Sequence, residues 1–337
     1  MKGAHRDSVY RVAFSLNGEF LISGGRDGTI AVWDTDTGTL TAPPIHAHDD
    51  LLYVVAIHPE QSHLASVRED GTIKLWFSSN GHLIDSEWTS QLVTREIDSV
   101  HDRPGGRRSS LTFSPDGQTI AAGDWGGSIH HWDITTRKLL YPPRCGHVGP
   151  VYSVQFRPTG NLLVSGGHDR KMQRWDLTSE NPEGDPMGAT INEALSIAFS
   201  QDAQMTAVST RTGEIIFWNL VDGQRLKQTL PGQTHSEIAF STDNTMLAAA
   251  SFDRTIHLWD IQTGQPRLSP LEGHIDTAGF VTFSPDGTCI LWDLESGKPG
   301  DVQLEGINPP ADLLQATLAS SRKAIARGQA VTNLKPF

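Results

Sequence analysis

The stretch VYRVAFSLNGEFLISGGRDGTIAVWD, residues 9–34, decides the fold. Apolar and polar residues alternate in VYRVAF, and two further apolar runs, FLISGG and TIAVWD, follow the turn sequences LNGE and RDGT. Short apolar runs separated by Asn-Gly and Asp-Gly predict antiparallel strands joined by tight turns. With a fourth short strand near Leu40, this unit is predicted to form a four-stranded meander.

The same unit recurs seven times along the chain. Its third strand ends in a tryptophan, and successive tryptophans are separated by 43, 56, 43, 43, 41 and 33 residues. One such sheet cannot bury both of its faces, but sheets stacked around an axis cover one another. The chain is therefore predicted to be all-β, with a seven-bladed β-propeller over residues 1–306. The seven tryptophans are Trp33, Trp76, Trp132, Trp175, Trp218, Trp259 and Trp292.

The repeats carry further short motifs. Five of the seven tryptophans are followed by aspartate, and the sequence FSPDG occurs at residues 113–117 and 283–287. Gly-His pairs occur at residues 146–147 and 273–274. Over residues 3–306 the chain closely resembles the WD-repeat family. The resemblance implies a non-catalytic scaffold, a rigid ring whose surface loops hold protein or peptide partners.

The resemblance also implies a buried polar network in each blade. A histidine before the first strand, a serine on the second, an aspartate in the next turn and the tryptophan satisfy one another's hydrogen-bonding groups. Repeat three lacks part of this set, because Ala122 and Gly126 occupy the serine and aspartate positions. A catalytic His–Ser–Asp interpretation is disfavoured, since the trio recurs from blade to blade beside a tryptophan. The complete sets are His5, Ser23, Asp27 and Trp33; His48, Ser66, Asp70 and Trp76; and His147, Ser165, Asp169 and Trp175.

Composition narrows the class of protein further. The net charge of −12 disfavours broad nucleic-acid binding, which needs a basic face. The chain has only two cysteines, and it shows neither the apolar core of a signal peptide nor an apolar run long enough to cross a membrane. These features predict a soluble protein of the cytoplasm, with the nucleus as the alternative. Adjacent His130 and His131 are expected on opposite sheet faces, and no phosphate loop or cofactor fingerprint occurs. We therefore expect no metal, cofactor, small-molecule substrate or membrane partner.

Aromatic and arginine side chains indicate a partner-binding patch. Three of the four tyrosines share one repeat position, which the resemblance places near the mouth of the central channel. Tyr, Trp and Arg are enriched at binding hot spots, so we predict a patch over the top face of blades one to four, centred on Tyr53, Arg107 and Trp125. It would suit an acidic or aromatic-bearing peptide. The alternative is that the tyrosines plug the channel and the arginines lie in a solvated loop. The predicted set is Tyr10, Tyr53, Tyr152, Arg107, Arg108, Trp125, Arg26 and Glu69.

Two regions depart from the repeat. The seventh repeat is ten residues short, which predicts a three-stranded blade with residues 289–294 paired directly to 277–284, unless an error in the gene model removed a piece. Residues 9–15 are predicted as the innermost strand of blade one and residues near 302–305 as the outer strand of blade seven. The ring would then close by packing alone. Residues 307–337 are predicted to form a helical tail, either capping the propeller or docking a partner.

Two other functions remain as alternatives. Residue 1 falls almost at the start of a repeat, which fits a sensor or regulatory propeller of a larger signalling protein of the ATPase, kinase or ubiquitin-ligase type. The third possibility is an enzyme that uses the central channel, but no specific motif supports it.

Overall fold

A computed structural model gives the fold of most of the chain. Every regular element among the described residues is a strand, and no described helix could span a membrane. The described residues are 4–7, 9–15, 17–35, 37–49, 52–60, 63–68, 72–79, 82–91, 110–178, 185–187, 192–220, 222–230, 235–271, 278–283 and 289–293.

The strands of this described part form seven antiparallel sheets in chain order. The first strands are β1 (Val9–Phe14), β6 (Leu52–Ile57), β10 (Ser110–Phe113), β15 (Val151–Phe156), β19 (Ala194–Phe199), β23 (His235–Phe240) and β26 (Ala278–Phe283). The second strands of sheets one to six are β2 (Phe20–Gly25), β7 (His63–Arg68), β11 (Thr119–Gly123), β16 (Leu162–Gly167), β20 (Met205–Thr210) and β24 (Met246–Ser251).

The tryptophans lie on the strands that follow. These are β3 (Thr29–Asp34), β8 (Thr72–Ser79), β12 (Ser128–Asp133), β17 (Met172–Asp176), β21 (Ile215–Asn219), β25 (Ile256–Asp260) and β27 (Cys289–Asp293). The outer strands are β4 (Thr39–Leu40) with β5 (Ile45–His46), β9 (His82–Gln91), β13 (Lys138–Leu139) with β14 (Arg144–Cys145), β18 (Asp185–Pro186) and β22 (Arg225–Leu230).

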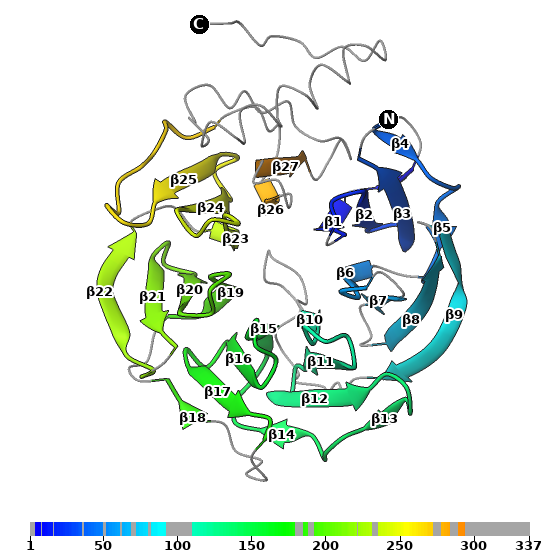
Figure 1. Cartoon of the computed structure of the whole chain (residues 1–337), viewed down its shortest axis with the longest axis horizontal. Coiled ribbons are helices and arrows are strands. Elements are labelled where there is room, and N and C mark those ends of the chain that lie inside the picture. The colour runs from blue at the N-terminus through cyan, green and yellow to red at the C-terminus, as the bar shows by residue number, and fades with distance from the viewer. Residues whose placement is uncertain are drawn as a thin grey trace, which may run out of the picture.

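The sheets stand in a circle, with first strands towards the centre and outer strands at the rim (Figure 1). Each first strand contacts the first strand of the next sheet, and β26 contacts both β23 and β1. The circle therefore closes between sheets seven and one. The strand β1 pairs with β2 in its own sheet, as predicted for residues 9–15.

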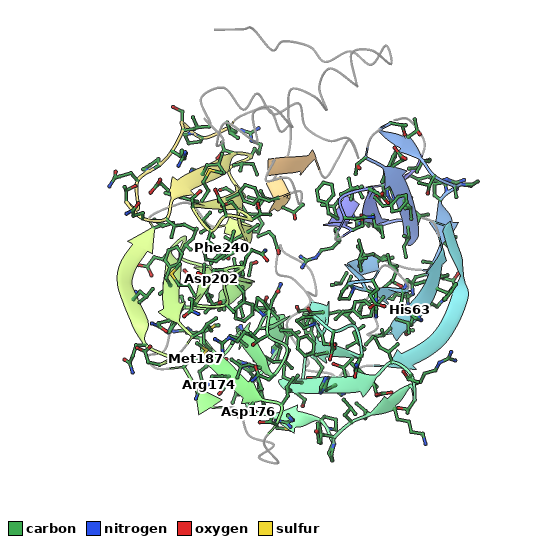
Figure 2. All side chains as sticks on the ribbon, in the orientation of Figure 1. His63, Arg174, Asp176, Met187, Asp202 and Phe240 are labelled. Carbon is green, nitrogen blue, oxygen red and sulfur yellow. The ribbon has the colours of Figure 1, made fainter. Side chains whose placement is uncertain are left out.

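The buried core lies between neighbouring sheets. Trp76 and Leu64 of sheet two share one buried cluster with Ile30 and Val32 of sheet one. Between sheets five and six, the rings of Phe217 and Phe240 meet edge-on with centroids 6.3 Å apart; Figure 2 marks the position of Phe240. Burial of such large rings in each sheet-to-sheet layer is the main favourable contribution to folding.

Glycines on the second strands let neighbouring sheets approach closely. A Cβ atom placed on Gly166 would lie 2.7 Å from Cβ of Ala194 on the first strand of sheet five. Any larger residue would push the two sheets apart. This contact explains the Ser-Gly-Gly sequence at residues 165–167 without invoking a phosphate site.

The shortened seventh repeat has the predicted direct pairing. Strand β27 pairs antiparallel with β26, from Ala278 opposite Asp293 to Phe283 opposite Cys289. The expected outer strand near 302–305, the insertion carrying Arg107 and Arg108, and the predicted helix in 307–337 lie outside the described residues.

Candidate functional site

One face of the ring is built from two kinds of loop. Because the first two strands of a sheet are antiparallel, the start of the first strand and the end of the second lie at the same edge. The loop after the second strand accepts backbone hydrogen bonds from the segment that enters the next sheet. In sheets three and four, the N–H of His147 donates to Gly127 O at 3.3 Å and the N–H of Val151 donates to Asp124 O at 3.0 Å. We call the surface formed by these segments the loop face.

A hydrogen-bond network anchors the loop face in sheet four. Nε2 of His147 lies 2.7 Å from Oγ of Ser165, and Nε1 of Trp175 donates to the same oxygen at 2.7 Å. Nδ1 of His147 lies 2.9 Å from Oδ1 of Asp169. The other carboxylate oxygen accepts the N–H of Val148 at 3.0 Å, so the network holds the entry segment against the turn.

Sheet one has the same network with one extra link. Nε2 of His5 lies 2.7 Å from Oγ of Ser23, to which Nε1 of Trp33 donates at 2.8 Å. Nδ1 of His5 lies 2.7 Å from Oγ1 of Thr29, and that hydroxyl donates to Asp27 at 2.6 Å. The carboxylate of Asp27 thus reaches the imidazole mainly through Thr29.

Sheet two repeats the part of the network that can be described. His48 lies 2.7 Å from Oγ of Ser66, and Trp76 donates to that oxygen at 2.8 Å. Asp70 lies outside the described residues.

Substitution of Asp169 is expected to destabilise the fold more than substitution of Asp27. Burial opposes ionisation of Asp169, but hydrogen bonds from His147 and from backbone N–H groups outweigh it and lower the pKa of the carboxyl group. Asp169→Ala should cost about 2 kcal/mol of unfolding free energy, because it leaves a buried imidazole without its acceptor. In Asp27→Ala, Thr29 still contacts His5, so the loss should be about 1 kcal/mol. Equal urea midpoints for both variants and the unsubstituted chain would show that the networks add no stability.

Sheet three contains a buried pair that the repeat pattern did not predict. Oδ2 of Asp124 lies 2.8 Å from Nε2 of His130, and both side chains are 3% exposed. Oδ1 of Asp124 accepts the N–H of Ser128 at 2.7 Å, and the ring of His130 stacks on Trp132 with centroids 5.5 Å apart. Asp124 thus forms a buried pair inside sheet three, a contact different from the one that Asp169 makes with the entry segment of sheet four.

A second group of polar side chains lies on the loop face of sheets four and five. The hydroxyl of Tyr152 lies 3.4 Å from Nδ1 of His168, which lies 3.2 Å from Oε1 of Glu193. The guanidinium of Arg211 lies 3.3 Å from the other oxygen of Glu193. The carboxylate is 12% exposed, whereas the side chains of His168 and Arg211 are 38% and 46% exposed. A nearly buried acid therefore fixes two partly exposed side chains in place.

The half-buried Trp125 lies on the loop face of sheet three, in the loop that follows β11. The backbone carbonyl of its neighbour Asp124 accepts the N–H of Val151, the residue before Tyr152, so the two segments are adjacent. We call Trp125, Tyr152, His168, Glu193 and Arg211 the loop-face cluster.

A β-bulge places Tyr152 in the cluster. The register of β15 and β16 shifts between Val151 and Ser153, so Tyr152 has no partner residue in the ladder. The same shift occurs around Tyr10 in β1 and Tyr53 in β6. Such bulges re-aim a side chain, a geometry that the alternating pattern does not reveal.

None of the other predicted site residues that the structure describes lies in this cluster. Arg26 is exposed and lies 3.8 Å from Asp7 in sheet one, away from the cluster. The side chains of Tyr10 and Tyr53, and all of Glu69, Arg107 and Arg108, lie outside the described part.

Sequence reasoning missed His168 and Arg211. Both lie seven residues before a blade tryptophan, the repeat position that Arg26, Glu69 and Trp125 of the predicted set also occupy. Extending that position around the ring would have found them. Among the described residues, no group of three or more His, Cys, Asp or Glu side chains could hold a metal ion.

Comparison with known families identifies the repeats. The family model described as WD domain, G-beta repeat matches residues 2–34, 39–76, 101–133, 140–176 and 224–260, which is more than half of the chain. The chain belongs to the WD-repeat family. The five matches cover repeats one to four and six. They leave out repeat five, where Val208 and Thr212 replace the network serine and aspartate, and the shortened WD repeat seven.

Several WD-repeat relatives are similar over part of their length. The periodic tryptophan protein 2 of Saccharomyces cerevisiae is 33% identical over 209 residues, which are 61% of this chain and 22% of that protein. The WD repeat-containing protein SL1-17 of Schistosoma mansoni is 30% identical over 31% of this chain and 33% of its own length. The NACHT domain- and WD repeat-containing protein 1 of Mus musculus is 28% identical over 32% of this chain and 8% of its own. Each match thus spans a third or less of the relative.

Proposed function

We propose that this chain is a non-catalytic protein-interaction scaffold, a seven-bladed propeller that binds a segment of a partner protein on its loop face. The observation that carries the proposal is the loop-face cluster. Contacts through His168 and Glu193 link Tyr152 to Arg211. Tyrosine, tryptophan and arginine are the residues enriched at protein–protein hot spots. The sequence predicts a patch over blades one to four, centred on Tyr53, Arg107 and Trp125. We propose that this patch reaches sheet five through Glu193 and Arg211.

The chemistry of the cluster favours an acidic segment that also carries an aromatic residue. His168 and Arg211 are fixed by Glu193 at 3.2 and 3.3 Å and keep exposed surface for a partner carboxylate. The ring of Trp125 supplies neighbouring apolar area. Fixing the donors in advance reduces the entropy lost when a partner binds.

Substitutions in the cluster should weaken partner binding without unfolding the ring. Trp125→Ala or Arg211→Ala is expected to cost about 2 kcal/mol of binding free energy towards a partner recovered by pull-down. Arg26→Ala is a matched control, because Arg26 occupies the same repeat position in sheet one and is similarly exposed. Isothermal titration calorimetry gives the Kd values, and thermal melts check folding. Unchanged binding of both cluster variants, with dependence on the opposite face, would refute the proposed site.

A regulatory propeller within a longer signalling protein is the second candidate. It is favoured by the similarity to a mouse protein whose name joins a NACHT domain to WD repeats. Sequencing of full-length transcripts distinguishes the two. An ATPase, kinase or ubiquitin-ligase region in the same reading frame supports the regulatory module.

The proposed compartment is the cytoplasm, with the nucleus as the alternative. Support comes from the low cysteine content, since only two cysteines occur in 337 residues. Imaging of the chain fused to a fluorescent protein tests this.

A further inference from the structure

The rim of sheet three exposes a continuous apolar segment. Leu139, Leu140 and Tyr141 are 43%, 40% and 41% exposed, and the two prolines that follow are also exposed. Strand β13 ends at Leu139 and β14 begins at Arg144, so the chain arches away from β12 between them. We call residues 137–143 the rim arch. Most exposed large apolar side chains occur singly, whereas here three are consecutive.

Sheet one has the same backbone arrangement with different side chains. Leu40 pairs with Trp33 as Leu139 pairs with Trp132. The N–H of the next residue, Thr41, donates to β3 at 2.9 Å, just as that of Leu140 donates to β12 at 2.9 Å. Sheet one places Thr41, Ala42 and two prolines where sheet three places Leu140, Tyr141 and two prolines. The backbone of the arch therefore does not need large apolar residues.

Sheet six gives a second comparison. Its residue at the position of Tyr141 is Leu268, which is half-buried and packs against the core of that sheet. An apolar residue at this position can therefore turn inwards. Tyr141 lies over the guanidinium of buried Arg144, 4.9 Å from the ring centroid, and stacks on His131 with centroids 6.4 Å apart, yet the residue is still 41% exposed.

The turn before the arch adopts a backbone conformation that is unfavourable for its residue. Arg137 has φ 60, and the matching residues of sheets one, five and six are Gly38, Gly223 and Gly264, with φ 65, 69 and 68. Glycine adopts this left-handed conformation without a steric penalty, but a residue with a Cβ does not. Sheet three thus has an arginine where these three sheets have glycine. Four other described residues with a Cβ, among them Arg170 and Arg254, also adopt this conformation, so the fold tolerates the arginine and a glycine at this position would relieve the steric penalty.

The rim arch is also locally basic within an acidic chain. Arg137 and Lys138 are exposed next to the apolar residues, and the matching residues of sheet one are Gly38 and Thr39. The chain as a whole has a net charge of −12. The two cations attract an acidic segment at short range, and a second copy of the chain is the alternative occupant that the test below distinguishes.

We propose that the rim arch is a second docking site, which binds an acidic peptide segment of a partner protein carrying at least one large apolar side chain. The apolar side chain packs on Leu140 and Tyr141, and the acidic groups pair with Arg137 and Lys138. This site lies on the outer edge of sheet three, whereas the loop-face cluster lies on one face of the ring. Binding at the rim arch can therefore be tested separately from binding at the loop-face cluster.

The test uses two variants that copy sheet one into sheet three. Leu140→Thr with Tyr141→Ala removes the apolar surface, and Arg137→Gly with Lys138→Thr removes the charges. Sheet one already carries the introduced residues at the matching positions of the same backbone arrangement. Arg137→Gly also removes a residue with a Cβ from a left-handed conformation. Thermal melts should therefore match or exceed those of the unsubstituted chain. Any loss of binding then reflects the surface and not unfolding.

Peptides from a random 12-residue display library are the probes. Selection on the full chain, with counter-selection on the apolar variant, should enrich peptides with acidic residues beside a large apolar residue. The Kd of enriched peptides should rise about tenfold or more in each variant and stay unchanged in Trp125→Ala. Enrichment of neutral or basic peptides, or no peptide that depends on the arch, would overturn the proposal. So would concentration-dependent dimerisation that the apolar variant abolishes, because the occupant would then be a second copy.

Discussion

Asp124→Ala is expected to lower the free energy of unfolding by about 3 kcal/mol, because removal of one partner of a buried pair leaves the other unsatisfied. Both Asp124 and His130 are 3% exposed, and their 2.8 Å contact lies inside sheet three. The substitution also removes the acceptor for the N–H of Ser128. Chemical denaturation at neutral pH gives the value directly.

Asp116→Ala is the matched control for this experiment. Asp116 also accepts two hydrogen bonds within sheet three, from Ser114 and from the N–H of Gln118, but its side chain is exposed. Solvent can replace those bonds, so we expect a loss of about 1 kcal/mol or less. If the two variants unfold at the same denaturant concentration, the buried pair does not contribute the stability assigned to it.

These two aspartates differ in how well their roles can be predicted from the sequence. The FSPDG motif predicts the turn containing Asp116, since local chemistry decides a tight turn. The role of Asp124 depends on the path of the loop, which brings the carboxylate to an imidazole six residues later. The repeat pattern places an aspartate two positions further on, where Gly126 stands, and so predicts only that the network is missing.

The loop-face cluster was predictable in part for a similar reason. Spacing alone places Tyr152 with Tyr10 and Tyr53 at one repeat position and marks Trp125 as unusual at its own. The contact of Glu193 with both His168 and Arg211 joins three segments of sheets four and five, and it depends on how those sheets pack. The basic rim arch was missed because an exposed Leu-Leu-Tyr sequence reads as an ordinary buried strand. Its exposure in the folded chain, beside the charges of Arg137 and Lys138, reveals it.

Mild acid should destabilise the protein through His131. This ring lies between sheets three and four, is 7% exposed, and contacts Thr119 and Phe156. Burial, together with the guanidinium of Arg144, lowers the pKa of His131 from 6.5 to about 4, and the carboxylate of Asp116 opposes this shift only weakly. The folded state therefore disfavours the protonated ring.

The direction of the pH effect follows from proton uptake. Above pH 6.5 His131 is neutral in both the folded and the unfolded chain, so it adds no pH dependence. Between pH 6.5 and 4 the unfolded chain binds a proton that the folded chain does not, and stability falls as the pH falls. The expected loss from His131 reaches about 3 kcal/mol at pH 4. His5 and His58, whose pKa values are also lowered by burial, add to the loss in the same direction.

His131→Phe isolates the contribution of this one ring. Phenylalanine keeps an aromatic ring against Phe156 and cannot take up a proton, although it loses the 2.8 Å contact with Thr119. Urea unfolding at pH 7 and pH 4 should show a smaller loss of stability for the variant, by about 3 kcal/mol. The carboxyl groups with lowered pKa values, among them Asp27 and Asp169, also cost stability as the unfolded chain takes up protons below about pH 5. They do so equally in both proteins, so the difference between the two proteins isolates His131. An equal loss of stability in both proteins would mean that His131 titrates in the folded state as it does in water, and that its burial between the sheets is incomplete.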